Sequence, residues 1–516
     1  MLNTSVNHQS SEDSVPCTVM SGTLHGVDGL PVSVEVDLLN RLPCVVIVGL
    51  PGCAIRESSE RVRSAIQTIG KDFPRKRVVI NLAPAGLRKT GAAFDLPIAI
   101  AILAESGQIP TEQLHDTVMV GELSLQGQLR PTRGALSIAM MAKATGAKRL
   151  VLPLRNAGEA ASVPGIEVLA ATTLQQVVKW LGEGIVLPRA TPPPLGQAYS
   201  TTDLLEVRGQ TLARRALEIA AAGGHNLLMI GPPGCGKTML ASRLPTILPT
   251  PSYNEAIDIT RIHSVAGTLN EVGLVQQRPF RAPHHTISRA GMFGNASLLP
   301  GEVSLSHNGV LFLDEVPEFP RGILELLRAP LENRNVTITR AAGTVRFPAN
   351  FSLIAAANPC PCGFRGHPTR PCSCGPASVE RYSSKLSGPW LDRIDLQVWV
   401  QPVPAQQLST SLQGESSADV RVRVEAARST QQERLHGTSF NCNAALSGDA
   451  VRTQACASPA ALSSLDDIVT ANGLSARAWS RILKVARTIA DLERCQHVES
   501  THIFEASAFR VAGGTP

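Results

Sequence analysis

Aromatic side chains are scarce in this chain. Of its 516 residues only 4% are Phe, Trp or Tyr, and tyrosine occurs three times. Proteins that hold single-stranded nucleic acid mainly by stacking need exposed aromatic rings on which successive bases rest. The composition therefore argues against base stacking as the main mode of binding.

Long apolar runs and a secretory leader are also missing. Residues 96–103 form a core-like apolar segment, far shorter than the roughly 18 residues of a membrane span. Residues 1–16 are polar and contain no basic stretch followed by an apolar one. We expect a cytoplasmic protein without a membrane partner, in which the eleven cysteines are thiols or metal ligands rather than disulfides. The net charge of +6 is compatible with nucleic acid but does not require it.

A glycine-rich segment at residues 231–238 gives the strongest functional signal. It fits G-x-x-x-x-G-K-[ST], the phosphate-binding P-loop, and lies between an apolar run, residues 227–230, and the start of a helical pattern. In such a loop backbone N–H groups surround the phosphates, the lysine neutralises the β and γ oxygens, and the following hydroxyl holds Mg²⁺. The predicted ligands are Gly231, Pro232, Pro233, Gly234, Cys235, Gly236, Lys237 and Thr238. We therefore expect binding of ATP with Mg²⁺.

Two further apolar runs end in polar residues that suit hydrolysis. Residues 310–313 are followed by Asp314, expected near Mg²⁺, and Glu315, expected to polarise the attacking water. Residues 351–357 end at Asn358, whose amide could contact the same water or the γ-phosphate. The alternative for Asn358 is a turn residue before proline. Together with the P-loop these residues predict an ATPase.

The order of the segments predicts an α/β protein of several domains. Alternating strand and helix patterns over residues 203–401 predict a P-loop core with a parallel sheet. Residues 17–182 form a separate unit after a flexible N-terminus, residues 1–16, and a proline-rich linker, residues 183–202, joins the two. Helical periodicity predicts a small helical domain over residues 402–516.

These motifs together resemble an AAA+ ATPase of the magnesium-chelatase-like group, and the chain is similar to the ComM/YifB family over residues 17–511. The resemblance implies a homo-hexameric, DNA-dependent motor, in some bacteria a branch-migration helicase that helps to integrate transforming DNA, with single-stranded or branched DNA as its partner. It implies an AAA+ core, a magnesium-chelatase-like helical lid, and an α+β domain of the Lon-protease type (ribosomal S5 domain 2-like) over residues 17–182. Besides the nucleotide motifs, it is carried by residues 48–51, 81–85, 93–97, 281–286, 391–395 and 474–479.

The resemblance assigns two arginines to the hydrolytic site. Arg393 resembles the arginine finger that reaches the γ-phosphate of a neighbouring subunit; its alternative is a surface ion pair with Asp392 or Asp395. Arg477 resembles the sensor-2 arginine, and Arg481, one helical turn later, competes for this role. A site completed by a neighbour is a physical reason for a ring, because hydrolysis in one subunit then reports to the next.

The Lon-like domain is expected to lack protease chemistry. The serine of that fold falls within residues 89–94, where the aligned residue is alanine, and its lysine falls within residues 133–137, where leucine stands. A Ser/Lys dyad requires both groups within hydrogen-bond distance. We expect this domain to bind or position a partner.

Four cysteines between Asn358 and Arg393 suggest a metal. Two pairs, each with one intervening residue, flank a loop rich in glycine and proline, and four thiolates suit a tetrahedral Zn²⁺. The alternatives are His367 as a substitute ligand, or a loop of reduced thiols without metal. The candidate zinc ligands are Cys360, Cys362, Cys372 and Cys374.

A basic segment between the nucleotide motifs is the candidate DNA contact. Arg278 and Arg281 are expected to bind phosphates, and Phe280 or His284 to lie against sugar or base. The alternative is a turn with solvated arginines. Two competing functions remain: a chelatase-type motor for metal insertion into a tetrapyrrole, disfavoured by the Lon-like domain, and an ATP-dependent protease, disfavoured by the missing dyad.

Overall fold

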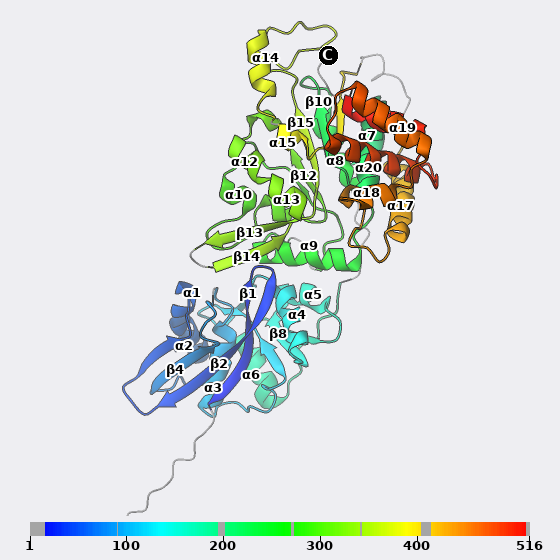
Figure 1. Ribbon diagram of the computed structural model, residues 1–516. Coiled ribbons are helices and arrows are strands. Elements are labelled where there is room, and N and C mark those ends of the chain that lie inside the picture. The colour runs from blue at the N-terminus through cyan, green and yellow to red at the C-terminus, as the bar shows by residue number, and fades with distance from the viewer. Residues whose placement is uncertain are drawn as a thin grey trace, which may run out of the picture. The chain divides into compact units, whose positions relative to one another are not determined.

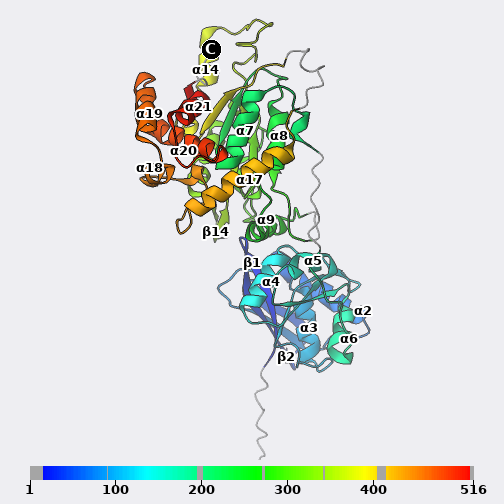
Figure 2. The same ribbon diagram turned by 90° about the vertical axis from the view of Figure 1, so that its right-hand side faces the viewer.

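The computed structural model describes residues 16–89, 91–193, 202–269, 273–340, 343–386, 388–403 and 414–511. The chain forms two compact units. The N-terminal unit comprises residues 1–194 with 260–274, and the C-terminal unit comprises residues 195–259 with 275–516. Both units combine a sheet with helices, so the predicted α/β fold class is confirmed (Figures 1 and 2).

Among the described residues, the N-terminal unit contains a seven-stranded mixed sheet in the order β3-β4-β2-β1-β5-β8-β9. The long β1 and β2 form an antiparallel hairpin, and β2 pairs antiparallel with β4. The β5, β8 and β9 strands run parallel to one another. The strands are β1 (Cys17–His25), β2 (Asp28–Leu39), β3 (Cys44–Val48), β4 (Arg77–Ala83), β5 (Thr117–Met119), β8 (Arg149–Pro153) and β9 (Glu167–Ala171), with a separate small hairpin of β6 (Glu122–Leu123) and β7 (Leu129–Arg130).

The core of this unit is built around α3 (Asp95–Glu105). Residues 95–104 of this helix are all buried, as expected for a helix that is apolar on every side. The apolar segment at residues 96–103 is thus a central helix of the unit. The other helices are α1 (Cys53–Arg56), α2 (Ser58–Thr68), α4 (Ala135–Ala144), α5 (Leu154–Ala161) and α6 (Leu174–Glu183).

The buried side chain of Lys89 joins two segments that carry the family resemblance, residues 48–51 and 81–85. The ammonium group of Lys89 donates hydrogen bonds to the carbonyl oxygens of Gly49 at 3.0 Å and Leu82 at 2.7 Å, and also to that of Pro84. Gly49 has φ +95°, and a Cβ atom there would lie 2.2 Å from the Leu82 oxygen. Residues 48–51 and 81–85 therefore have a structural role at the ends of β3 and β4. Within the described part of the chain, the hydrogen-bond partners of the Lys89 ammonium group are carbonyl oxygens and include no hydroxyl group.

Among the described residues, the C-terminal unit contains a five-stranded sheet in the order β11-β12-β15-β10-β16. All neighbouring pairs are parallel, as predicted. The carboxyl ends of β10, β12 and β15 meet at one edge, where the predicted nucleotide residues follow. The strands are β10 (Leu227–Ile230), β11 (Phe280–Arg281), β12 (Val310–Leu313), β15 (Ser352–Ala357) and β16 (Leu396–Trp399), and a separate hairpin consists of β13 (Asn335–Arg340) and β14 (Gly343–Pro348).

Helices cover this sheet and continue into the C-terminal segment. The long α17 lies beside α7 and α8, visible as the orange helix against two green ones in Figure 2. The core helices are α7 (Thr211–Gly223), α8 (Lys237–Ile247), α9 (Tyr253–Ala266), α10 (Arg289–Phe293), α11 (Glu302–Leu305), α12 (Arg321–Leu326), α13 (Arg328–Asn333), α14 (Pro376–Ser383) and α15 (Gly388–Leu391). The later helices are α17 (Ser417–Arg434), α18 (Ala450–Ala455), α19 (Pro459–Ala471), α20 (Ala476–Leu492) and α21 (Ser500–Val511). Within the described residues, no helix has the length and apolar character needed to cross a membrane.

The core helices and the C-terminal helices share one apolar cluster. Leu217 of α7, Leu240 of α8, Val424 of α17 and Ile489 of α20 all belong to it. The predicted domain boundaries at residues 183–202 and 401–402 remain predictions. One segment was not predicted to leave the C-terminal unit. Residues 260–274, which include the end of α9, belong to the N-terminal unit. There the Ser264 hydroxyl donates a hydrogen bond of 3.0 Å to the Glu159 carboxylate.

We predict that Lys89→Met destabilises the N-terminal unit. Methionine retains the length of the side chain but leaves the carbonyl oxygens of Gly49, Leu82 and Pro84 without their donor, at a cost of about 2–4 kcal/mol. Thermal unfolding followed by circular dichroism should show an earlier transition. Lys148→Met is the matched control, since Lys148 forms only an exposed ion pair with Asp116. Equal unfolding midpoints for the two variants would contradict the structural role of Lys89.

Candidate nucleotide site and cysteine cluster

The glycine-rich loop leaves β10 and leads directly into α8. Gly231 passes so close to the neighbouring chain segment that a Cβ atom there would lie 2.2 Å from the Val400 oxygen. Gly234 and Gly236 have φ values of +78° and +92°, which favour glycine. Because α8 begins at Lys237, its N-terminal N–H groups open toward the loop, an arrangement that favours phosphate.

Lys237 is a buried cation surrounded by neutral acceptors. Its Nζ donates to the carbonyl oxygens of Gly231 at 2.7 Å and Pro232 at 2.9 Å, and to Asn358 Oδ1 at 3.2 Å. Burial lowers the pKa of Lys237. Among the described residues no carboxylate forms an ion pair with this ammonium group, so a bound phosphate would supply the missing counter-charge. The site fits an anionic ligand.

The oxygen ligands expected for a divalent cation lie next to this lysine. The Thr238 hydroxyl donates a hydrogen bond of 2.8 Å to Asp314 Oδ2, which joins the start of α8 to the end of β12. A hydroxyl and a carboxylate are hard oxygen ligands of the kind Mg²⁺ takes in phosphate sites. The structure thus brings together the predicted residues Lys237, Thr238, Asp314 and Asn358, which come from three different parts of the sequence.

Glu315 follows Asp314 in an uncommon backbone conformation. Its φ of +50° lies in the left-handed region, and its N–H donates to Asp314 Oδ1 at 2.9 Å. The Glu315 side chain is 52% exposed, and its Oε2 lies 3.6 Å from His285 Nδ1. Sequence reasoning missed this histidine as part of the site. The only sequence signal for His285 is its place in residues 281–286, a segment that carries the family resemblance and overlaps the candidate DNA contact.

The arginines implied by the family resemblance lie away from the P-loop of their own chain. Arg393 forms an ion pair with Glu332, a carboxylate not considered from the sequence, and its side chain is 11% exposed. Arg477 is 67% exposed and lies 2.9 Å from Asp392. Its competitor Arg481 donates to the Ile394 carbonyl oxygen at 3.1 Å. The role of Arg393 in a neighbouring subunit and the sensor-2 role of Arg477 remain proposals.

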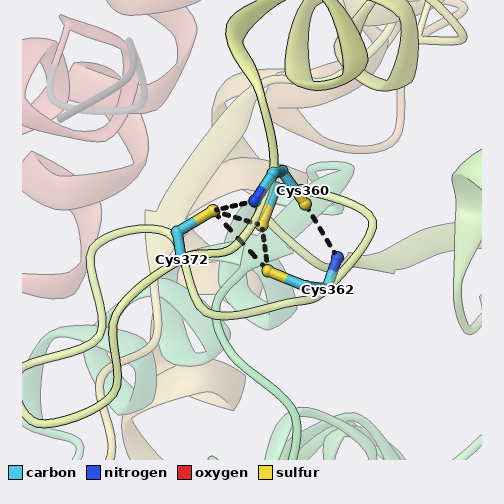
Figure 3. A group of neighbouring side chains, drawn as sticks. Cys360, Cys362 and Cys372 are labelled. Atoms are coloured by element: carbon cyan, nitrogen blue, oxygen red, sulfur yellow. Dashed lines mark hydrogen bonds between the residues drawn. The ribbon is translucent and has the colours of Figure 1, made fainter.

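The four predicted cysteines form one cluster (Figure 3). Cys360 Sγ lies 3.4 Å from Cys362 Sγ and 3.6 Å from Cys372 Sγ, and all four sulfur atoms lie within 4.8 Å of one another. A backbone hydrogen bond from Phe364 lowers the pKa of the Cys362 thiol to about 5, whereas burial and the neighbouring thiols raise the pKa values of Cys372 and Cys374. A tetrahedral zinc with Zn–S bonds of about 2.3 Å separates its sulfur ligands by about 3.8 Å. The cluster therefore has suitable dimensions for zinc.

The cysteine loop also contacts the nucleotide loop. Gly363 has φ +81°, and a Cβ atom there would lie 2.7 Å from Pro233 Cδ. The predicted substitute ligand His367 is not part of the group of four cysteines that could hold a metal ion. Its Nδ1 accepts hydrogen bonds from the N–H groups of Thr369 at 3.2 Å and Arg370 at 3.1 Å, so it is bound within its own loop instead.

Both arginines of the candidate DNA segment are bound to carboxylates of their own unit. Arg278 donates two hydrogen bonds to Glu255, at 3.1 and 3.0 Å, and Arg281 donates two to Glu302, at 2.6 and 2.7 Å. The paired carboxylate raises the pKa of Arg281. The side chain of His284 is exposed and its Nδ1 lies 2.9 Å from the Thr286 hydroxyl. Each arginine is thus paired with a carboxylate, and the geometry favours a structural role for them.

Comparison with known proteins indicates the same family as the sequence motifs do, over most of the chain. Residues 203–408 match the family described as magnesium chelatase, subunit ChlI, residues 34–156 match subunit ChlI of Mg-chelatase, and residues 414–510 match the ChlI C-terminal family. The uncharacterized protein YifB of Salmonella typhimurium is 43% identical over 488 residues, 94% of this chain and 95% of YifB. Competence protein ComM of Haemophilus influenzae is 42% identical over 500 residues, 95% of this chain and 97% of ComM. A Lon protease of Lachnoclostridium phytofermentans is 25% identical over 166 residues, 30% of this chain and 20% of the protease.

A P-loop, an adjacent Asp–Glu pair and a polar strand-end residue on one parallel sheet, followed by helices, define an AAA+ ATPase of the magnesium-chelatase-like group. This family implies the use of ATP and Mg²⁺, and the residues described above fit both. The chain belongs to the ComM/YifB family within this group, with a Lon-like N-terminal unit.

We predict that Arg278→Ala lowers the free energy of unfolding, so that its effect is not limited to DNA binding. Removing the guanidinium leaves Glu255 without its partner and should cost about 2–3 kcal/mol, less than for a fully buried pair because Glu255 is partly exposed. Denaturant titration measures this cost. Arg321→Ala is the control, because the Arg321–Glu325 pair is exposed and should contribute less than about 1 kcal/mol. Unchanged stability together with weakened DNA binding would instead support the predicted phosphate contact.

Proposed function

We propose that this protein is a homo-hexameric, ATP-hydrolysing motor that acts on DNA in the cytoplasm, as a branch-migration helicase in transformation or recombination. The carrying observation is the convergence of Lys237, Thr238, Asp314 and Asn358 at one sheet edge, in a chain similar along its length to a competence protein. Single-stranded or branched DNA is the proposed partner.

The roles of the residues follow from their chemistry. The backbone of residues 231–236 and the α8 N-terminus bind the phosphates, and Lys237 neutralises the β and γ oxygens. Thr238 and Asp314 would hold Mg²⁺, which when bound neutralises charge on the phosphate oxygens. Glu315 orients the attacking water and takes its proton, while the Asn358 amide contacts that water or the γ-phosphate.

A hexameric ring gives Arg393 a function that it cannot have within one chain. In the isolated chain it pairs with Glu332, whose side chain is 58% exposed. An exposed carboxylate can exchange for a phosphate of a neighbouring subunit at modest cost. We propose Arg393 as the arginine finger in the ring and Arg477, on α20, as the sensor-2 arginine.

DNA binding does not require base-specific contacts, because a motor must hold any sequence. Arg278 and Arg281 would have to exchange their carboxylates for phosphates, so His284 is the better candidate of the three predicted contacts. The Lon-like unit is a second place for a DNA contact and is proposed to bind or position a partner.

A chelatase-type motor that drives metal insertion into a tetrapyrrole is the second candidate. It is favoured by the magnesium-chelatase descriptions of all three matching families. Because one of them covers residues 34–156, the N-terminal unit does not exclude this function, contrary to the expectation from sequence. The full-length similarity to a competence protein favours DNA.

ATP turnover in the presence of different partners distinguishes the two. We expect branched DNA to raise turnover several-fold and linear duplex DNA to raise it less, because a motor couples hydrolysis to the substrate it moves. A tetrapyrrole-binding chelatase subunit should have no effect. Stimulation by that subunit and none by DNA would contradict the DNA function.

Mixed rings test the finger. Arg393→Ala should bind ATP nearly normally but hydrolyse it slowly, and Lys237→Ala should neither bind nor hydrolyse. Mixing the two should restore part of the turnover, because one subunit supplies a complete P-loop and the other a complete finger. Native mass spectrometry of rings in which one variant carries an added mass tag confirms that the rings are mixed. Mixed rings without any gain in turnover would argue against Arg393 acting in a neighbouring subunit.

We propose further that the four-cysteine cluster binds one Zn²⁺. The short Sγ–Sγ distances support this, and the contact of Gly363 with Pro233 makes the loop a support of the P-loop. Thiols that lie this close without a metal are the alternative.

Elemental analysis of protein purified without added metal should find about one zinc per chain. The double substitution Cys372→Ser and Cys374→Ser should abolish it, whereas Cys44→Ser, an exposed cysteine of the N-terminal unit, should not. Folded, active protein with zinc near zero would leave a loop of reduced thiols.

A further inference from the structure

The segment that follows β11 lies against the carboxylate proposed as the general base. His285 Nδ1 lies 3.6 Å from Glu315 Oε2. Beyond this contact, the described residues make no hydrogen bond or ion pair to the Glu315 carboxylate. Half of the Glu315 side chain is exposed, so the histidine is its main restraint.

The histidine itself is held from two sides. Its ring meets the ring of Phe319 edge-on, with centroids 6.4 Å apart and an angle of 77°. On the other side its ring centroid lies 4.0 Å from that of His284. The imidazole therefore has little freedom to move away from Glu315.

The loop carrying His285 is anchored to the sheet beside β12. Phe280 of β11 pairs with Val310 of β12, and its ring stacks on that of Phe312 with centroids 5.9 Å apart. Arg281 adds its two hydrogen bonds to Glu302. Since Glu315 is the second residue after β12, the pairing of the two strands fixes the spacing between His285 and Glu315.

The backbone of Glu315 is restrained from the opposite direction. Glu315 has a left-handed backbone conformation, and its N–H donates a hydrogen bond to Asp314 Oδ1. Both features hold the backbone of Glu315 beside the Asp314 carboxylate. With the backbone held by Asp314 and the carboxylate held by His285, Glu315 has a restricted choice of orientations. A general base misplaced by about 1 Å can cost about 100-fold in rate.

We propose that His285 is a positioning residue, which orients the Glu315 carboxylate for its work on the attacking water. This inference rests on the proposed ATPase function. His285 touches neither the phosphate loop nor the nucleotide in this account and acts through Glu315. Residues 281–286 then serve the hydrolytic site: Arg281 anchors the loop and His285 presents its ring to the base.

The central variants are His285→Ala and His285→Asn. Alanine removes the ring, whereas the asparagine amide nitrogen takes roughly the place of Nδ1. We expect His285→Ala to lower kcat about 10–100-fold, with the Kd for a nonhydrolysable ATP analogue changed less than about twofold. His285→Asn should recover a substantial part of kcat. His436→Ala, which removes an exposed histidine that follows α17 and lies outside the site, is the matched control and should hydrolyse ATP normally.

A double-mutant cycle separates positioning from general damage. If His285 acts only through Glu315, adding His285→Ala to Glu315→Gln should cause no further loss. Unchanged or raised kcat in His285→Ala, a parallel loss of nucleotide affinity, or additive losses in the double variant would each overturn the inference.

The same set distinguishes failure of this inference from failure of the proposed function. If Glu315→Gln is slow while His285→Ala is normal, only the positioning role is wrong. If Glu315→Gln hydrolyses ATP at the normal rate, the proposed base is wrong and the role of His285 falls with it. Thermal unfolding of each variant confirms that losses in kcat are not losses of folded protein.

Discussion

The buried ammonium group of Lys237 is the constraint around which the nucleotide site is arranged. Its hydrogen-bond partners among the described residues are the oxygen atoms of Gly231, Pro232 and Asn358 and the Cys235 sulfur, with no carboxylate in an ion pair, so an anionic ligand would complete the site. Gly231 must lack a side chain because β16 continues into Val400 beside it. The parallel sheet brings the ends of β10 and β15 together, which places the Asn358 amide next to the same lysine.

The segment that carries Arg393 is held by the C-terminal helices. Arg481 of α20 and Arg510 of α21 both donate to the Ile394 carbonyl oxygen, at 3.1 and 2.9 Å. Arg477 adds an ion pair with Asp392. Movement of these helices would therefore shift Arg393, and in the proposed ring this would link the C-terminal helices of one subunit to the neighbouring site that Arg393 is proposed to serve.

Sequence predicted the features that are local in the chain. The P-loop and the buried strand before Asp314 and Glu315 are contiguous patterns, and the parallel sheet was predicted from alternating strand and helix patterns. The four cysteines lie within one short loop. Partners in space could not be predicted: Arg278 and Arg281 read as free cations because Glu255 and Glu302 meet them only in the fold. His285 was missed for the same reason, since its contact with Glu315 depends on the pairing of β11 with β12. The sharing of residues 260–274 with the N-terminal unit likewise has no local signature.

Nucleotide affinity of a Lys237→Met variant tests the central claim most directly. Methionine fills the same buried space without charge, so the loop should still fold while the counter-charge for phosphate is lost. Isothermal titration with a nonhydrolysable ATP analogue and Mg²⁺ should give micromolar or tighter binding for the wild type, with affinity at least about 100-fold weaker for the variant, equivalent to about 2.7 kcal/mol. Equal affinities in two equally stable proteins would contradict the assignment of Lys237 as the phosphate-binding cation.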